Sequence, residues 1–117
     1  MIWTLSQVAL GGAIGCVLRF LTVMAISGPL ATLTVNVVGS FAMGILYVFL
    51  AGRMQFAPLL MVGVMGGFTT FSTFSLDVLK LWEAGQTLQV GAYVAGSVIL
   101  SIGALVLGVG IARGAFA

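Results

Sequence analysis

Long apolar stretches separated by short polar ones dominate the chain. Turn-forming or charged residues gather at 27–29, at 51–58 around Arg53, and at 83–87. A bilayer core of about 30 Å needs about 20 mostly apolar residues for each helical crossing. The pattern therefore predicts an all-α membrane protein with four transmembrane helices, at about residues 3–26, 31–50, 58–81 and 89–112.

The composition strengthens this prediction. Hydrophobic residues make up 62% of the 117 residues and charged residues only 5%, where a soluble domain carries roughly 25% charged residues. So small a soluble domain needs far more polar surface than this chain offers. Short loops leave nothing for a soluble catalytic domain, so residues 1–117 form a single transmembrane unit. The first apolar segment has no basic stretch before it, so we expect a retained helix and not a signal peptide.

Several functional classes are excluded by what the sequence lacks. The chain has no histidine and a single cysteine, Cys16. Intramolecular disulfides, Cys/His metal sites and histidine-based catalysis are therefore excluded. The net charge of +2 is spread over isolated cations, which is no basic patch for nucleic acid. An enzyme is the least favoured class, because nucleophile, base and soluble pocket are all absent.

The basic residues divide equally between the two ends of the predicted helices. Arg53 and Arg113 lie on the side of the termini, and Arg19 and Lys80 on the other side. Because orientation follows the lysine and arginine bias of short loops, this balance favours insertion in both orientations. If Arg19 is instead buried in the protein, a mild bias with the termini inside remains. Four helices are too few to enclose an aqueous path, so we expect an antiparallel dimer with a two-fold axis.

Glycine is unusually frequent, with 17 copies in the chain. Small residues at four-residue spacing let helix backbones approach closely in lipid. General glycine enrichment of membrane helices explains some of these residues. The four-residue spacing indicates helix contacts at three pairs: Gly11/Gly15, Gly63/Gly67 and Gly110/Gly114.

Polar residues within the apolar spans are the candidates for function, because lipid makes them costly. Arg19 either extends to the nearby interface or acts as an anchor that pairs with carbonyls or a carboxylate, or attracts anions. Asn36 either joins two helices through hydrogen bonds or donates to a permeating anion. Thr32, Asn36 and Ser40 are four residues apart and form a stripe on one helix face, which favours a lined path.

The densest group of polar residues is in the third span, over residues 63–75. Helix propensity is lowest at Gly66-Gly67, and the hydroxyls that follow compete for backbone hydrogen bonds. We therefore expect this helix to be broken near mid-membrane, with freed carbonyls that suit a small cation. Phe71 and Phe74 present positive ring edges to an anion, although plain packing is the alternative. Hydroxyl donors surround them or follow on the fourth span: Ser72, Thr73, Ser75, Tyr93, Ser97 and Ser101.

Carboxylates are absent from the middle of the predicted spans, because Asp77 and Glu83 lie toward the end of the third span and in the following loop. A small four-helix multidrug or cation exporter needs a membrane carboxylate to exchange protons, so it is the weaker alternative. A structural membrane assembly protein would need no hydroxyl track. A path rich in donors favours an anion that requires no proton chemistry.

Three segments together resemble the Fluc/CrcB family of fluoride channels: GGAIGCVLRF, ATLTVNVVGSF and GVMGGFTTFSTFSLD. The resemblance covers the whole chain, and the third segment is its most specific part. Ala31 stands where the family usually has glycine, and Asp77 where glutamate is usual.

The resemblance implies passive fluoride export across the inner membrane by an antiparallel, dual-topology homodimer with two pores. It implies a structural Na⁺ at the dimer interface, held by backbone carbonyls at the positions of Gly66 and Thr69. It places Arg19 near the aqueous entrance. The positions that match the family's pore are Asn36, Phe71, Phe74, Ser72, Thr73 and Ser75, with Tyr93, Ser97 and Ser101 from the fourth helix.

Overall fold

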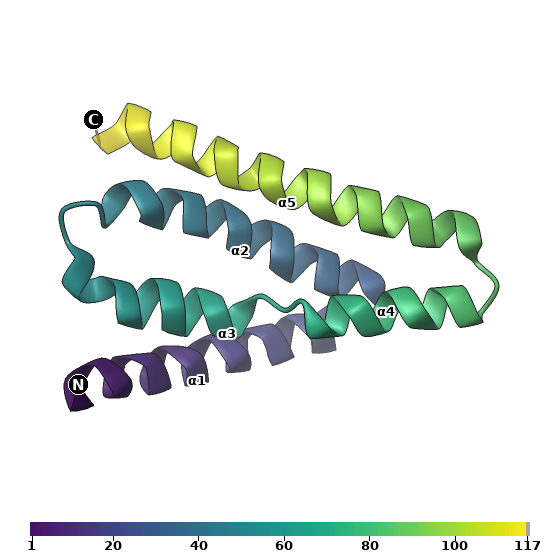
Figure 1. Ribbon diagram of the computed structural model, residues 1–117, viewed down its shortest axis with the longest axis horizontal. Coiled ribbons are helices and arrows are strands. Elements are labelled where there is room, and N and C mark those ends of the chain that lie inside the picture. The colour runs from purple at the N-terminus through teal and green to yellow at the C-terminus, as the bar shows by residue number, and fades with distance from the viewer. Residues whose placement is uncertain (117) are drawn as a thin grey trace.

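The protein is built from long helices that run back and forth along one axis (Figure 1). The computed structural model describes residues 1–116. Within that part of the chain, four helical segments are long and apolar enough to cross a membrane: Ile2–Ala25, Pro29–Phe49, Met54–Glu83 and Thr87–Ala115. A rise of about 1.5 Å per residue makes each long enough for a core of about 30 Å. The predicted all-α, multi-pass membrane fold is therefore confirmed.

Three of the crossings are single helices. They are α1 (Ile2–Ala25), α2 (Pro29–Phe49) and α5 (Thr87–Phe116). Helix α5 begins two residues earlier than the predicted 89 and continues past the predicted 112. Glycines with positive φ make the turns before α2 and α5, Gly28 at 78° and Gly85 at 77°, a conformation that suits glycine best.

The third crossing is composite. A short 3₁₀ turn, η1 (Met54–Phe56), leads into the π-helix η2 (Pro58–Met65) and the single turn α3 (Gly66–Phe68). The chain then leaves the helical conformation at residues 69–71 and resumes as α4 (Ser72–Glu83). Thr69 is extended, with φ −85° and ψ 159°. Gly66 and Gly67, where helix propensity is lowest, are themselves helical, and the interruption lies just beyond them.

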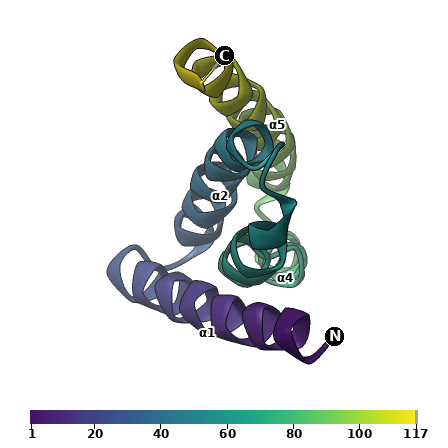
Figure 2. The ribbon, with the colours of Figure 1, turned by 90° about the vertical axis from the view of Figure 1, so that its left-hand side faces the viewer.

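The helices associate mainly as two pairs. Helix α2 packs along α5, and α1 packs along η2 and α3, with far less contact between the pairs. Seen from the end of the molecule, α1 runs beneath while α2 and α5 lie together above it (Figure 2). Helix α4 continues the third crossing and packs against α5. The interruption at residues 69–71 is thus the place where the third crossing passes from one helix pair to the other.

Glycines create the closest contacts within each pair. A Cβ on Gly11 would overlap the Leu59 carbonyl oxygen of η2, and a Cβ on Gly67 would lie 2.7 Å from the Gly12 carbonyl oxygen. A Cβ on Gly15 or Gly63 would also overlap the backbone of the neighbouring helix. Gly44 and Gly108 allow the same close backbone contact between α2 and α5. Two of the three predicted glycine pairs therefore form a helix contact. At the third pair, Gly110 and Gly114, a Cβ would meet no other described residue within 4 Å.

Replacing Gly11 by alanine tests this packing. The new methyl group would meet the η2 backbone, so we expect Gly11→Ala to lower the free energy of unfolding by about 1–3 kcal/mol. Gly12→Ala is the matched control, because nothing lies within 4 Å of a Cβ there and alanine favours a helix. Thermal unfolding of the purified protein in one detergent compares the two. Equal melting temperatures for both variants would contradict the contact.

Candidate functional site

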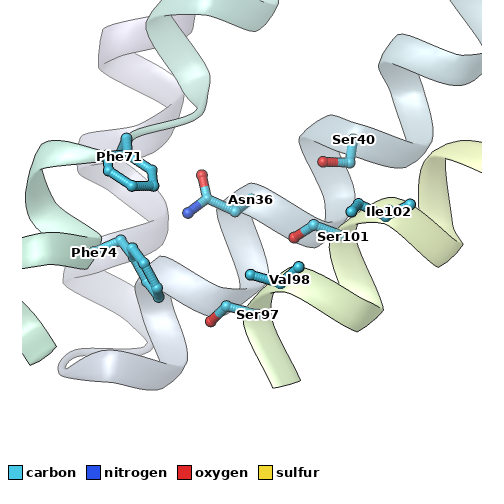
Figure 3. A pocket seen from close by; sticks show the side chains of 8 residues that line it. All are labelled: Asn36, Ser40, Phe71, Phe74, Ser97, Val98, Ser101 and Ile102. Carbon is cyan, nitrogen blue, oxygen red and sulfur yellow. The ribbon is translucent and has the colours of Figure 1, made fainter. Parts of the chain in front are cut away.

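A cavity of about 250 Å³ opens beside the interruption of the third crossing. Helix α2 forms its floor, α5 one wall, and the residues around the start of α4 the other wall (Figure 3). The lining combines phenyl rings, hydroxyls, one amide and two aliphatic side chains. The lining residues are Asn36, Ser40, Phe71, Phe74, Ser97, Val98, Ser101 and Ile102.

Asn36 holds the interruption in place. Its Nδ2 donates to the Thr70 carbonyl oxygen at 3.0 Å, and its Oδ1 accepts from the Thr70 amide at 2.8 Å. One side chain thus satisfies both backbone groups of a residue that has left the helix, where unpaired groups would be costly. One amide hydrogen of Asn36 remains outside this pair. Asn36 therefore joins α2 to the third crossing through hydrogen bonds, as one sequence interpretation proposed, and it also lines the cavity. Donation to a permeating anion stays a prediction.

Thr70 organises the start of α4. Its Oγ1 accepts from the Thr73 amide at 3.2 Å and lies 3.3 Å from the Ser72 Oγ. A threonine hydroxyl in this position satisfies an amide that the first helical turn leaves unpaired. Thr70 was not among the residues predicted from the sequence, although a hydroxyl three residues before a helical amide is a recognisable capping pattern.

The two predicted phenylalanines lie together at the cavity. Their ring centroids are 5.4 Å apart with planes inclined at 47°, and Phe74 also contacts the Tyr93 ring at 5.2 Å. Phe74 is buried, whereas 77% of Phe71 is exposed. Phe74 is therefore fixed by packing within one chain, and Phe71 stands open at the rim of the cavity.

Serine hydroxyls face the rings from the floor of the cavity and from its α5 wall. The oxygen atoms of Ser40, Ser97 and Ser101 point toward the side on which Phe71 and Phe74 lie (Figure 3). Ser97 is only 6% exposed, and its Oγ has no hydrogen-bond partner among the described residues. A buried hydroxyl without a partner is costly, so it is available to donate to a ligand in the cavity.

The other predicted hydroxyls do not line this cavity. Ser75 Oγ donates to the Phe71 carbonyl oxygen at 3.0 Å, and Ser72 lies beside Thr70. Thr73 likewise contributes no side chain to the lining. Of the predicted track, the structure gathers Asn36, Phe71, Phe74, Ser97 and Ser101, and it leaves out Ser72, Thr73, Ser75 and Tyr93.

Tyr93 is engaged with Asp77. Its hydroxyl donates to the Asp77 Oδ2 at 2.9 Å. In this structure the Tyr93 hydroxyl is therefore not available to donate a hydrogen bond to an anion. Asp77 is 9% exposed, although its position near the end of the third span suggested a more peripheral carboxylate. This buried acid–tyrosine pair was not predicted from the sequence.

The carbonyls of Gly66 and Thr69 are released from regular helical bonding. The Thr70 amide donates to Asn36 and not to Gly66, and the Thr73 amide donates to Thr70 Oγ1 and not to Thr69. The Thr69 carbonyl oxygen instead accepts from Arg19 Nη1 at 3.3 Å. Arg19 therefore pairs with a carbonyl, one of the roles considered for it. Oxygen atoms freed in this way are suitable ligands for a hard cation, and the described residues offer no cluster of three metal-binding side chains instead.

Comparison with known proteins identifies the relatives of this chain. Residues 6–109 match the family model described as CrcB-like protein, Camphor Resistance (CrcB). A protein of Paracoccus denitrificans named fluoride-specific ion channel FluC is 47% identical, over 97% of this chain and 98% of its own length. Proteins of the same name from Cereibacter sphaeroides and Rhodospirillum centenum are 51% and 50% identical, over 97% and 94% of this chain and 98% and 95% of their own lengths.

The pairing of Asn36 with Thr70 leads to a prediction. Asn36→Asp replaces the donor to the Thr70 carbonyl by a second acceptor, so we expect the free energy of unfolding to fall by about 1–3 kcal/mol. Amide hydrogen exchange at residues 69–73 should also become faster. Ser40→Ala, one turn further along the same face of α2, is the control. Unchanged exchange in Asn36→Asp would show that the pair does not hold the interruption.

Proposed function

The chain belongs to the CrcB-like protein family, and on that basis we propose that it is a fluoride-selective channel. In this proposal the protein lets fluoride leave the cell passively across the inner membrane and so lowers cytoplasmic fluoride. The observation that carries it is the cavity beside residues 69–71, where hydroxyl, amide and phenyl groups meet without a charged side chain in the lining. The names of the relatives support the choice of anion.

Hydrogen bonding accounts for conduction of a strongly hydrated ion. Fluoride crosses only if protein donors replace its water shell. A hydrogen bond to a charged group contributes about 1.5–3 kcal/mol, so several donors in series offset much of the dehydration cost. The unpartnered Ser97 hydroxyl, Ser101 and the remaining amide hydrogen of Asn36 are the donors at hand. Without a fixed cation in this stretch, the ion is not held too tightly to leave.

The phenyl rings add weak attraction and limit the width of the path. Aromatic rings are positive at their edges, so Phe71 and Phe74 interact with an anion without trapping it. Chloride is larger and accepts weaker hydrogen bonds, so it recovers less of its dehydration cost in the same cavity. Selectivity then follows from size and donor chemistry together.

We propose that two chains assemble as an antiparallel homodimer with two pores. The exposure of Phe71 supports this assembly, because a pore-lining ring would otherwise face lipid on one side. With Arg19 paired inside the protein, Arg53 and Arg113 at one end and Lys80 at the other leave only a mild bias in charge, which still supports insertion in both orientations. A two-fold axis relating such chains gives each copy the same environment.

A structural Na⁺ at the dimer interface belongs to the same proposal. The carbonyl oxygens of Gly66 and Thr69 would hold it, because neither is occupied by the usual helical amide. When bound, the ion supplies a fixed positive charge at the interface. Arg19, which already donates to the Thr69 carbonyl, orients that oxygen.

The buried Asp77 gives the exporter alternative its strongest support, since a proton-coupled exporter uses a carboxylate within the membrane. This carboxylate does not line the cavity, and Tyr93 donates a hydrogen bond to it. Because no exchange site is formed around Asp77 in the described chain, the channel is the better interpretation.

Fluoride efflux from liposomes tests the channel directly. We expect the purified protein to release fluoride rapidly and chloride far more slowly. Phe71→Ile should reduce fluoride efflux about tenfold, which corresponds to about 1.4 kcal/mol. Phe20→Ile on α1, also exposed but outside the cavity, serves as the control. Chloride efflux at a comparable rate would refute selectivity, and full flux in Phe71→Ile would remove that ring from the pore.

Removal of sodium tests the cation site. Replacing Na⁺ by N-methylglucamine at constant chloride should lower the melting temperature by several degrees, because the folded dimer loses a bound ligand. Adding Na⁺ back should restore the original value. An identical melting temperature in both media, up to high Na⁺, would argue against a structural sodium ion.

A further inference from the structure

A second cavity, of about 410 Å³, lies at one end of the molecule. It is formed by the end of α2, the beginning of the third crossing and the last turn of α5. The lining is mostly apolar but includes a phenol and a guanidinium. The lining residues are Tyr47, Val48, Ala51, Met54, Met61 and Arg113.

The two cavities lie along the same side of α2. Asn36 and Ser40 line the first cavity, and Tyr47 and Ala51 line the second. Spacings of four, seven and four residues place these side chains on one helix face. The second cavity therefore lies further along the same face of α2, toward the end of that helix.

Helix α5 repeats this arrangement. Ile102 lines the first cavity and Arg113 the second, and their spacing of eleven residues places these two on one face of α5. Between the two cavities, the backbones of α2 and α5 are in close contact at Gly44 and Gly108. Both cavities are thus lined by the α2–α5 pair, one on each side of this close contact.

The charges at this end favour an anion. Among the described residues that line the two cavities, Arg113 alone carries a charge. Arg53 belongs to the same end, in the turn after α2. Both acidic side chains of the chain, Asp77 and Glu83, lie on α4, which runs toward the opposite end (Figure 1). Among the described residues, the side-chain charge at this end is therefore positive.

We propose that the second cavity is the mouth of the conduction path, where Arg113 collects fluoride from water before it enters the uncharged stretch. This inference rests on the proposed function and extends it by a binding site for a small inorganic anion. The guanidinium attracts the ion at the aqueous end, where solvent keeps the interaction weak enough for release. The Tyr47 hydroxyl is a neighbouring donor. In an antiparallel dimer, one such mouth faces each side of the membrane.

The test measures fluoride efflux from neutral phosphatidylcholine liposomes at low fluoride, in low and high salt. Arg113→Gln should reduce the low-salt rate about fivefold, which one unit charge a few ångströms away provides in water. The reduction should disappear near 1 M salt, where the screening length is about 3 Å. Arg113→Lys should retain most of the rate.

Arg53→Gln is the matched control, because it removes the same charge at the same end but outside the cavity. There Arg53 donates to the Phe49 carbonyl oxygen and lies over the Phe49 ring. The proposal is overturned if Arg113→Gln equals Arg53→Gln, or if its deficit persists at high salt. Melting temperatures of both variants separate a loss of folding from a loss of rate.

Two further outcomes keep this proposal apart from the one on which it rests. If the wild-type protein conducts no fluoride, the proposed function fails and the assay of Arg113 has no rate to compare. If wild-type flux is rapid and Arg113→Gln matches it, only the mouth is refuted. A deficit that appears solely in liposomes with anionic phosphatidylglycerol would assign the cavity to a lipid phosphate instead.

Discussion

The arrangement of this protein depends on one side chain that pairs with one backbone unit. Asn36 donates to and accepts from Thr70, and so satisfies a peptide that has left the helix inside an apolar environment. In lipid, an unpaired peptide group costs several kcal/mol. With that pair in place, the third crossing changes course between the two helix pairs, the carbonyls of Gly66 and Thr69 are released, and Phe71 reaches the cavity. The proposed cation site and the proposed anion path are therefore consequences of the same local break.

Close helix packing provides the rigid frame for this break. Gly11 and Gly15 bring α1 against η2 and α3, while Gly44 and Gly108 bring α2 against α5. Each pair is held by backbone contact, since lipid supplies no hydrophobic drive between helices. Contact between the pairs is weak, and both cavities lie beside α2 and α5 where residues of the third crossing face them. The glycine contacts within each pair therefore serve stability, and the cavities provide the surfaces that we assign to function.

The crossings and the family could be predicted from the sequence because apolar length and specific motifs are local properties. The membership of Asn36, Phe71, Phe74, Ser97 and Ser101 in one cavity also followed from helical spacing and family resemblance. The position of the interruption could not, because it depends on contacts between distant segments: Gly67 packs against α1, the Thr69 carbonyl accepts from Arg19, and Thr70 pairs with Asn36. The Asp77–Tyr93 pair depends on how α4 meets α5, which no local pattern encodes.

The π-helix η2 has a consequence for how this chain tolerates changes in length. Its backbone bonds span five residues where an α-helix spans four, so the segment Pro58–Met65 is wound more loosely than its neighbours. Loss of one residue there can be absorbed by tightening to an α-helix, without displacing the glycines beyond it. A loss within α1 or α2 has no such reserve and would rotate every following side chain. Deletions of one residue during divergence should therefore be accommodated in η2 before any other part of the membrane-spanning chain.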